Sequence, residues 1–183
     1  MILKRKRKKD FFCCYGISSK ASVDNQHVLF LDYDTKNLHN IVEHLHYLQE
    51  EYGLSDIYVI GSTNGFNAVC LDVLPLSVCY AIGTDILSPC DRDFFKYAFN
   101  RGYFTLRFDC DKELRFILES DNRKHERSLA HKKFLEWFFS IEIKDDSSFN
   151  GYTKIDFIQF PSSKNGYHLV EKNLPSNLKV MRE

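Results

Sequence analysis

The chain has 183 residues, of which 44% are hydrophobic and 27% charged. These values suit one folded domain and exclude a disordered or low-complexity protein. The formal net charge is zero, but six of the 25 basic residues form a single run, namely Lys4, Arg5, Lys6, Arg7, Lys8 and Lys9. Such a run is typical of a segment that contacts nucleic acid or an acidic partner, and it also suits a solvated terminus.

The cysteines and the apolar runs indicate the compartment. Six cysteines occur without a Cys-x-x-Cys pair, which predicts reduced thiols and no zinc site. No apolar run approaches the length of a membrane span, and the residues after Met1 lack an apolar signal segment. We therefore expect an intracellular protein of the cytoplasm or nucleus with no membrane partner.

In chain order, the first predicted elements are a strand, a helix and a hairpin. Residues 1–26 look basic, irregular and flexible, and residues 27–31 form an apolar run that fits a buried strand. Apolar residues then recur at helical spacing up to Tyr52, with Thr35 as a possible cap and Gly53 as the stop. Residues 57–71 hold two apolar runs around Ser-Thr-Asn-Gly and predict a hairpin.

The second half of the chain predicts further helices and hairpins. Residues 75–87 and 91–100 favour helices, the second with Asp91 as its cap, and residues 126–139 favour an amphipathic helix. Hairpins are expected at 103–118 and 154–170, followed by a polar tail at 172–183. The sequence thus predicts one α+β domain over residues 27–171, with a mainly antiparallel sheet and helices packed on it.

The strand at 27–31 runs into two carboxylates, Asp32 and Asp34. Positions i and i+2 of a strand point to the same face, where two carboxylates repel each other unless a cation lies between them. Oxygen ligands of this kind suit Mg²⁺ or Mn²⁺. The plain alternative is that Asp34 and Thr35 cap the helix while Asp32 only ends the strand.

These segments resemble the archaeo-eukaryotic primases and related primase-polymerases of small viral or plasmid type. Residues 29–34, Leu-Phe-Leu-Asp-Tyr-Asp, are similar to that family's Asp-x-Asp signature after an apolar strand. Residues 62–67, Ser-Thr-Asn-Gly-Phe-Asn, are similar to its Ser-x-His hairpin, with Asn67 where the family's nucleotide-binding His stands. A third, apolar-apolar-Asp signature falls on Asp109 or Asp156, and residues 103–107 are similar to an aromatic-Thr-Leu-Arg strand.

The resemblance implies a fold, an activity and a set of site residues. It implies an RRM- or ferredoxin-like core. The implied activity is that of a nucleotidyltransferase, namely a DNA primase/polymerase. The implied partners are nucleotides, nucleic acid and other replication proteins. Asp32, Asp34 and a third Asp (Asp109 or Asp156) would be catalytic, with Mg²⁺ or Mn²⁺ on Asp32 and Asp34. The nucleotide contacts it implies are Ser62, Asn64, Asn67 and Arg107, with Lys164 and His168 as further candidates. Because Asn67 cannot carry the charge of an imidazolium, two alternatives stay open, an altered active site or a primase-like fold that has lost catalysis.

Two other functions remain open on the sequence alone. The chain could be a non-catalytic module that binds nucleic acid or protein through an RRM-like sheet, with structural roles for Asp32 and Asp34. The string His44-Leu45-His46 matches the His-apolar-His motif of rolling-circle replication initiators. Inside a helical pattern, however, positions i and i+2 diverge, so we interpret the string as accidental.

Overall fold

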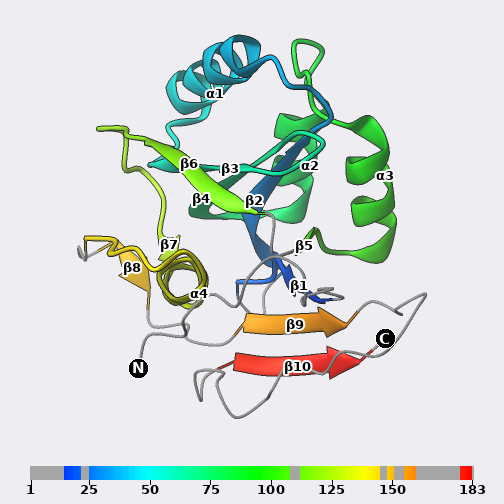
Figure 1. Ribbon diagram of the computed structural model, residues 1–183, viewed down its shortest axis with the longest axis vertical. Coiled ribbons are helices and arrows are strands. Elements are labelled where there is room, and N and C mark those ends of the chain that lie inside the picture. The colour runs from blue at the N-terminus through cyan, green and yellow to red at the C-terminus, as the bar shows by residue number, and fades with distance from the viewer. Residues whose placement is uncertain are drawn as a thin grey trace.

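A computed structural model of the chain describes residues 15–21, 25–107, 112–144, 148–150, 155–159 and 178–182. Figure 1 shows helices on both sides of a curved sheet, with a second group of strands below. The fold is α+β, and its strand pairs are mostly antiparallel. The elements are β1 Tyr15–Ser18, β2 Gln26–Tyr33, α1 Leu38–Tyr52, β3 Ile57–Gly61, β4 Phe66–Pro75, α2 Leu76–Thr84, α3 Arg92–Arg101, β5 Thr105–Arg107, β6 Glu113–Leu118, β7 Arg127–Ser128, α4 Leu129–Phe139, β8 Phe149–Asn150, β9 Ile155–Gln159 and β10 Leu178–Arg182.

The larger sheet is built around β4. One edge of β4 pairs antiparallel with β2 along its whole length, and the other pairs first with β3 and then, at Asp72, with β7. Strand β6 joins the outer edge of β3. Strands β2 and β3 therefore run parallel with β4 between them, as in a split β-α-β unit. The sheet then continues at β3 rather than at β2, so the strands in the described part of the chain do not follow a complete ferredoxin-like order.

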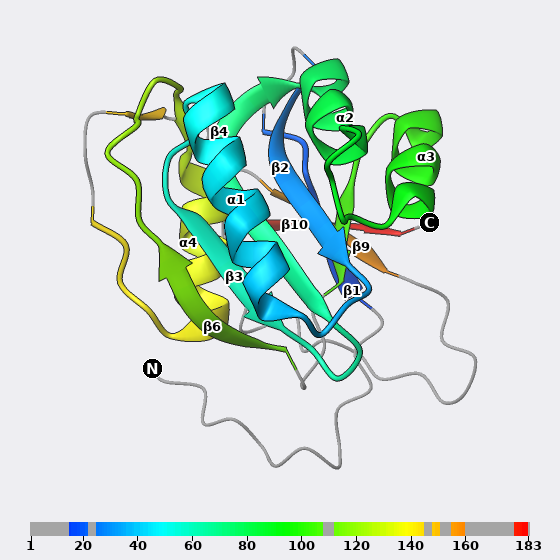
Figure 2. The same cartoon turned by 90° about the horizontal axis from the view of Figure 1, so that it is seen from above.

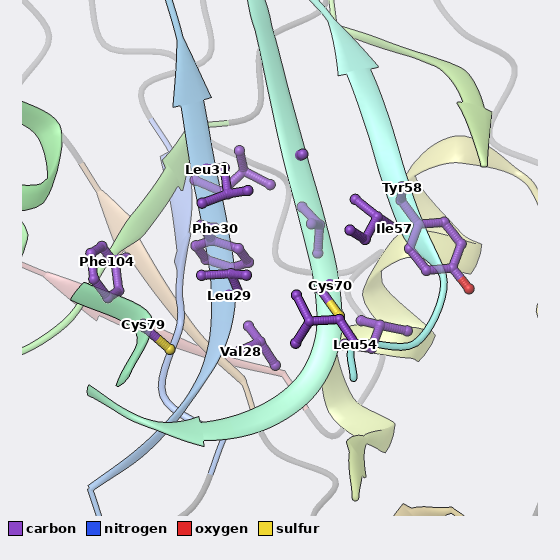
Figure 3. Close-up of a cluster of buried hydrophobic side chains, with 14 of the residues drawn as sticks. Val28, Leu29, Phe30, Leu31, Leu54, Ile57, Tyr58, Cys70, Cys79 and Phe104 are labelled. Atoms are coloured by element: carbon purple, nitrogen blue, oxygen red, sulfur yellow. The ribbon is translucent and has the colours of Figure 1, made fainter. Parts of the chain in front are cut away.

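The strand predicted at residues 27–31 is confirmed as a buried element. Val28, Leu29 and Phe30 of β2 are fully buried, and Figure 3 shows them in one apolar cluster with Cys70 of β4 and Ile57 of β3. Helix α1 covers one face of the sheet and α4 the other (Figure 2). Ring contacts link β2 to both helices: Tyr33 contacts His44 of α1 on one face, and Phe30 contacts His131 of α4 on the other. A continuous apolar run is what a strand buried on both faces requires.

The predicted hairpin at 57–71 is confirmed as β3 and β4 joined by a short turn. The predicted hairpin at 103–118 is wrong, because β5 pairs with β1 in the second sheet whereas β6 pairs with β3 in the first. A pattern of apolar residues identifies a strand but not its partner. The first strand of the third predicted hairpin, at 154–170, is observed as β9. Its second strand, at residues 166–170, lies outside the described part of the chain.

The second sheet uses strands near both ends of the described chain. Its order is β10-β9-β1-β5. Strand β1 lies in the segment 1–26, and β10 lies in the segment 172–183, the two stretches that were expected to flank the domain. Both strands are short, and their pairing is with residues distant in sequence. No local pattern distinguishes such strands from irregular chain.

The helix caps differ in one place from expectation. Asp91 caps α3 as predicted, since its side chain accepts a hydrogen bond from the Asp93 amide. Helix α1 is capped by Asn37 rather than Thr35, and Thr35 instead accepts from the Asn37 amide. Asp34 is exposed and lies before this cap. Capping of α1 therefore does not account for Asp34.

Candidate functional site

Asp32 lies at the end of β2 and faces Asn67 of β4 across the sheet. The two residues are register partners, and the Asn67 Nδ2 donates a hydrogen bond of 2.7 Å to the Asp32 Oδ1. Asn67 is buried, whereas Asp32 is half-buried. The first two segments of the primase resemblance thus supply neighbouring side chains on one face of the sheet.

Lys112, the residue just before β6, completes this cluster. Its Nζ donates a hydrogen bond to the Oδ1 of Asn67. The Asn67 amide therefore lies between a carboxylate on its nitrogen side and an ammonium on its oxygen side. We call Asp32, Asn67 and Lys112 the strand-end cluster. Lys112 is only 8% exposed, so the ammonium belongs to the protein interior rather than to a solvated surface.

Burial raises the pKa of Asp32. Lys112 and the hydrogen bond from Asn67 oppose this rise, while the nearby carboxylates of Asp34 and Asp91 add to it. The ionised form of Asp32 is therefore destabilised in the folded protein, and Lys112 and Asn67 compensate this only in part. Negative charges gathered in this way are relieved by a proton or by a cation.

Asp91 also lies beside the strand-end cluster, at the corner where β2 ends and α3 begins, and its backbone is hydrogen-bonded to that of Asp32. Its amide donates to the Asp32 carbonyl at 2.9 Å, which fixes the start of α3 beside the end of β2. The sequence indicated Asp91 only as a helix cap, and it did not single out Lys112 at all. Both lie far from Asp32 in the chain, and only the pairing of β3 with β6 and the docking of α3 bring them near.

The turn between β3 and β4 packs against the end of β2. The Ser62 amide donates to the Gly65 carbonyl at 2.9 Å, and the Ser62 Oγ lies 3.2 Å from the same oxygen. A side-chain carbon at Gly65 would lie 2.1 Å from the Tyr33 carbonyl oxygen. Only glycine allows this close approach, which places the turn next to Asp34. Asn64, at the tip, is exposed.

The other predicted site residues are not brought into this corner by the described structure. Arg107 is exposed at the end of β5, opposite Gly16 of β1. Asp156 lies on β9 in the second sheet, opposite Lys179 of β10. Asp109, Lys164, His168 and the basic run of residues 4–9 lie outside the described residues.

The histidines of the string His44-Leu45-His46 diverge on α1. His44 is buried and its Nδ1 lies 2.9 Å from the Tyr33 hydroxyl, whereas His46 is exposed. Burial lowers the pKa of His44 to about 4, with a smaller opposing effect of Asp85. The pair therefore does not present two ligands on one surface, and His44 supports Tyr33 behind the strand-end cluster.

The carboxylates fit a divalent cation in their chemistry but do not complete a ligand set. Asp32 and Asp34 offer the oxygen donors that Mg²⁺ and Mn²⁺ prefer. Within the described residues, however, no three His, Cys, Asp or Glu side chains are arranged to hold a metal ion. A cation here would also need water or ligand oxygens.

Comparison with protein-family models, with curated proteins and with solved structures finds no match. None of the helices in the described ranges is long and apolar enough to cross a bilayer. The functional argument therefore depends on the geometry of the corner at the end of β2.

Proposed function

We propose that this chain is a replication-associated, primase-like protein that binds nucleotides and nucleic acid at the strand-end cluster. One observation carries the proposal: Asp32 and Asn67, from two segments that resemble primase-polymerase signatures, are paired across adjacent strands by a direct hydrogen bond. Nucleotidyl transfer is the activity that such a site would serve. An intracellular setting, in the cytoplasm or nucleus, belongs to the same proposal.

Each side chain has a separate task in this proposal. Asp32 and Asp34 hold a divalent cation, and the Ser62 turn offers hydroxyl and backbone groups beside it. Mg²⁺ or Mn²⁺, when bound, supplies neutralisation of phosphate charge and activation of an attacking hydroxyl. Asn67 orients the Asp32 carboxylate by its hydrogen bond. Asp91 fixes the backbone at the end of β2 and adds negative charge that favours cation binding.

The experiment measures Mn²⁺-dependent nucleotide incorporation on a single-stranded DNA template. Wild type is compared with the double variant Asp32→Asn and Asp34→Asn, which removes two charges and keeps the side-chain shapes. The matched control is Glu119→Gln. Glu119 is an exposed carboxylate just after the last residue of β6, whereas Lys112 of the strand-end cluster lies just before the first.

We expect wild type and Glu119→Gln to incorporate nucleotide and the double variant to lose at least about 100-fold in rate. Equal incorporation by wild type and the double variant would contradict the catalytic assignment of Asp32 and Asp34. Absence of incorporation in all three would contradict nucleotidyl transfer by this chain.

A non-catalytic binding module is the second candidate, and one observation favours it. Asn67 is neutral, and its amide is already engaged on both sides by Asp32 and Lys112. This function predicts binding of single-stranded DNA without incorporation, and binding that is unchanged in the double variant. The same three proteins therefore distinguish the two candidates when a DNA-binding titration is run beside the incorporation assay.

A further inference from the structure

Lys112 is a buried ammonium that the sheet holds toward the end of β2. It is 8% exposed and hydrogen-bonds to Asn67. Burying a charged lysine is costly unless partners compensate it. A lysine that serves only the solubility of the protein would extend its ammonium into water instead. Its contact with Asn67 and its electrostatic interaction with Asp32 place this charge within the strand-end cluster.

The register of the sheet explains why Lys112 reaches this corner. Asn67 is opposite Ile60 on β3, and Ile60 is opposite Leu114 on β6. Side chains two residues apart on a strand share a face. Lys112 lies just before β6, two residues before Leu114, and its hydrogen bond to Asn67 places its ammonium beside that side chain. Strands β2 and β4 and the residue just before β6 thus contribute polar side chains to one end of the sheet.

Lys112 supplies positive charge next to three carboxylates at the end of β2. Asp34 and Asp91 are each close enough to Asp32 for their charges to act on it. Three carboxylates repel a phosphate group, and Asn67 has no charge with which to attract one. Lys112 is the basic side chain that acts on Asp32 among the residues described. Lysine binds phosphate as a compact point charge and does not need the planar geometry of arginine.

We propose that Lys112 is a phosphate-binding residue of this site and contacts the polyphosphate of a nucleoside triphosphate. The inference rests on the proposed function. The Oδ1 of Asn67 accepts a hydrogen bond from the Lys112 ammonium and so orients it. The Asn67–Lys112 pair thus supplies both the hydrogen-bonding group and the positive charge that Asn67 alone lacks.

The test compares the affinity of mant-ATP with that of mant-adenosine, each measured by fluorescence anisotropy in the presence of Mg²⁺. The proteins are wild type, Lys112→Met, Lys112→Arg and the control Lys124→Met. Lys124 is exposed and lies against Gly53 at the far end of α1. A residue with only a structural role would change both affinities together, whereas a phosphate-binding residue changes their ratio.

We expect Lys112→Met to weaken mant-ATP binding about tenfold or more, the equivalent of one charge-assisted hydrogen bond. Its mant-adenosine affinity should stay the same, and Lys112→Arg should recover most of the triphosphate preference. Lys124→Met should match wild type. If wild type binds mant-ATP and Lys112→Met keeps the same ratio, the role of Lys112 is overturned while the proposed function stands. If wild type binds no mant-ATP, both are overturned.

A second measurement covers the case in which Lys112→Met does not fold. Wild type labelled with ¹³C at the lysine Cε is titrated with ATP and with adenosine, and the Lys112 resonance is assigned with Lys112→Arg. We expect that resonance to shift with ATP and to stay in place with adenosine. An unchanged resonance with saturating ATP would overturn the inference.

Discussion

At the residue scale, Asp32 is the group whose environment differs most from what the sequence indicates. The sequence predicted a pair of carboxylates side by side, whereas the structure shows Asp32 half-buried against Asn67 and Asp34 exposed beyond the strand. The strand and the hairpin that carry Asp32 and Asn67 were each predicted from a local pattern. The contributions of Lys112 and Asp91 could not be predicted, because they depend on the docking of distant elements.

Asp32 is expected to lower the stability of the folded chain at neutral pH. Its pKa is raised, chiefly by burial, so the folded state holds the Asp32 proton more strongly than the unfolded state. Stability from this group is therefore present at low pH and is lost as the pH rises through its titration. We predict that Asp32→Asn melts at a higher temperature than wild type at pH 7, by roughly 2–4 °C for each kcal/mol relieved.

This comparison is made by thermal unfolding in EDTA, because a bound cation would stabilise wild type selectively. Glu119→Gln serves as the control and should melt within about 1 °C of wild type. A lower melting temperature for Asp32→Asn would show that the charged carboxylate stabilises the fold.

At the scale of elements, the turn between β3 and β4 shows how a local pattern can predict structure correctly. Ser62, Asn64 and Gly65 are turn-forming residues, and the hairpin at 57–71 is observed as predicted. The hairpin expected at 103–118 failed because its two strands find partners in different sheets. Turn chemistry is encoded within a few residues, whereas strand partnership depends on the whole chain.

Gly65 is the residue that lets this turn approach β2. A Cβ there would meet the Tyr33 carbonyl oxygen at 2.1 Å, and that oxygen belongs to backbone that cannot move aside cheaply. We predict that Gly65→Ala lowers the free energy of unfolding by about 1–3 kcal/mol. Urea unfolding measures this change. Asn64→Ala, at the exposed tip, should stay within about 0.5 kcal/mol of wild type, and equal effects of the two variants would count against the close approach.

At the scale of the whole molecule, buried histidines join the two sheets and their helices. His131 of α4 lies with its Nδ1 2.7 Å from the Ser128 Oγ and its Nε2 2.8 Å from the Ser18 carbonyl of β1. His27 of β2 lies 2.9 Å from the Ser19 Oγ through its Nδ1. Burial lowers the pKa of His27, His44 and His131 to about 4 in each case.

These histidines predict a loss of stability in acid. A lowered pKa means that the unfolded state binds protons more readily, so stability is lost as the pH falls from 6.5 toward 4. Each unit of pKa shift is worth about 1.4 kcal/mol, and the raised pKa values of Asp32 and Asp72 act in the opposite direction. Urea unfolding at pH 7 and pH 5 should show lower stability at pH 5, also in the surface variant His39→Gln. Equal or greater stability at pH 5 would contradict neutral buried histidines.

The basic run of residues 4–9 makes a separate prediction for nucleic-acid binding. A segment with six basic residues should add salt-sensitive affinity for single-stranded DNA. We predict that deletion of residues 4–9 weakens binding about tenfold or more at low salt and flattens its dependence on salt. A titration by fluorescence anisotropy measures both effects. Unchanged affinity and salt dependence would assign the run to solubility alone.

The central claim is that a cation and nucleotide bind at the strand-end cluster. Its most direct test is paramagnetic broadening of backbone amide NMR signals by Mn²⁺ in the presence of ATP. We predict that the amides of Asp32, Asp34 and Asn67 broaden first, that Glu119 is unaffected, and that the Asp32→Asn, Asp34→Asn double variant loses the effect. Broadening that spares these residues, or that persists in the double variant, would contradict the claim.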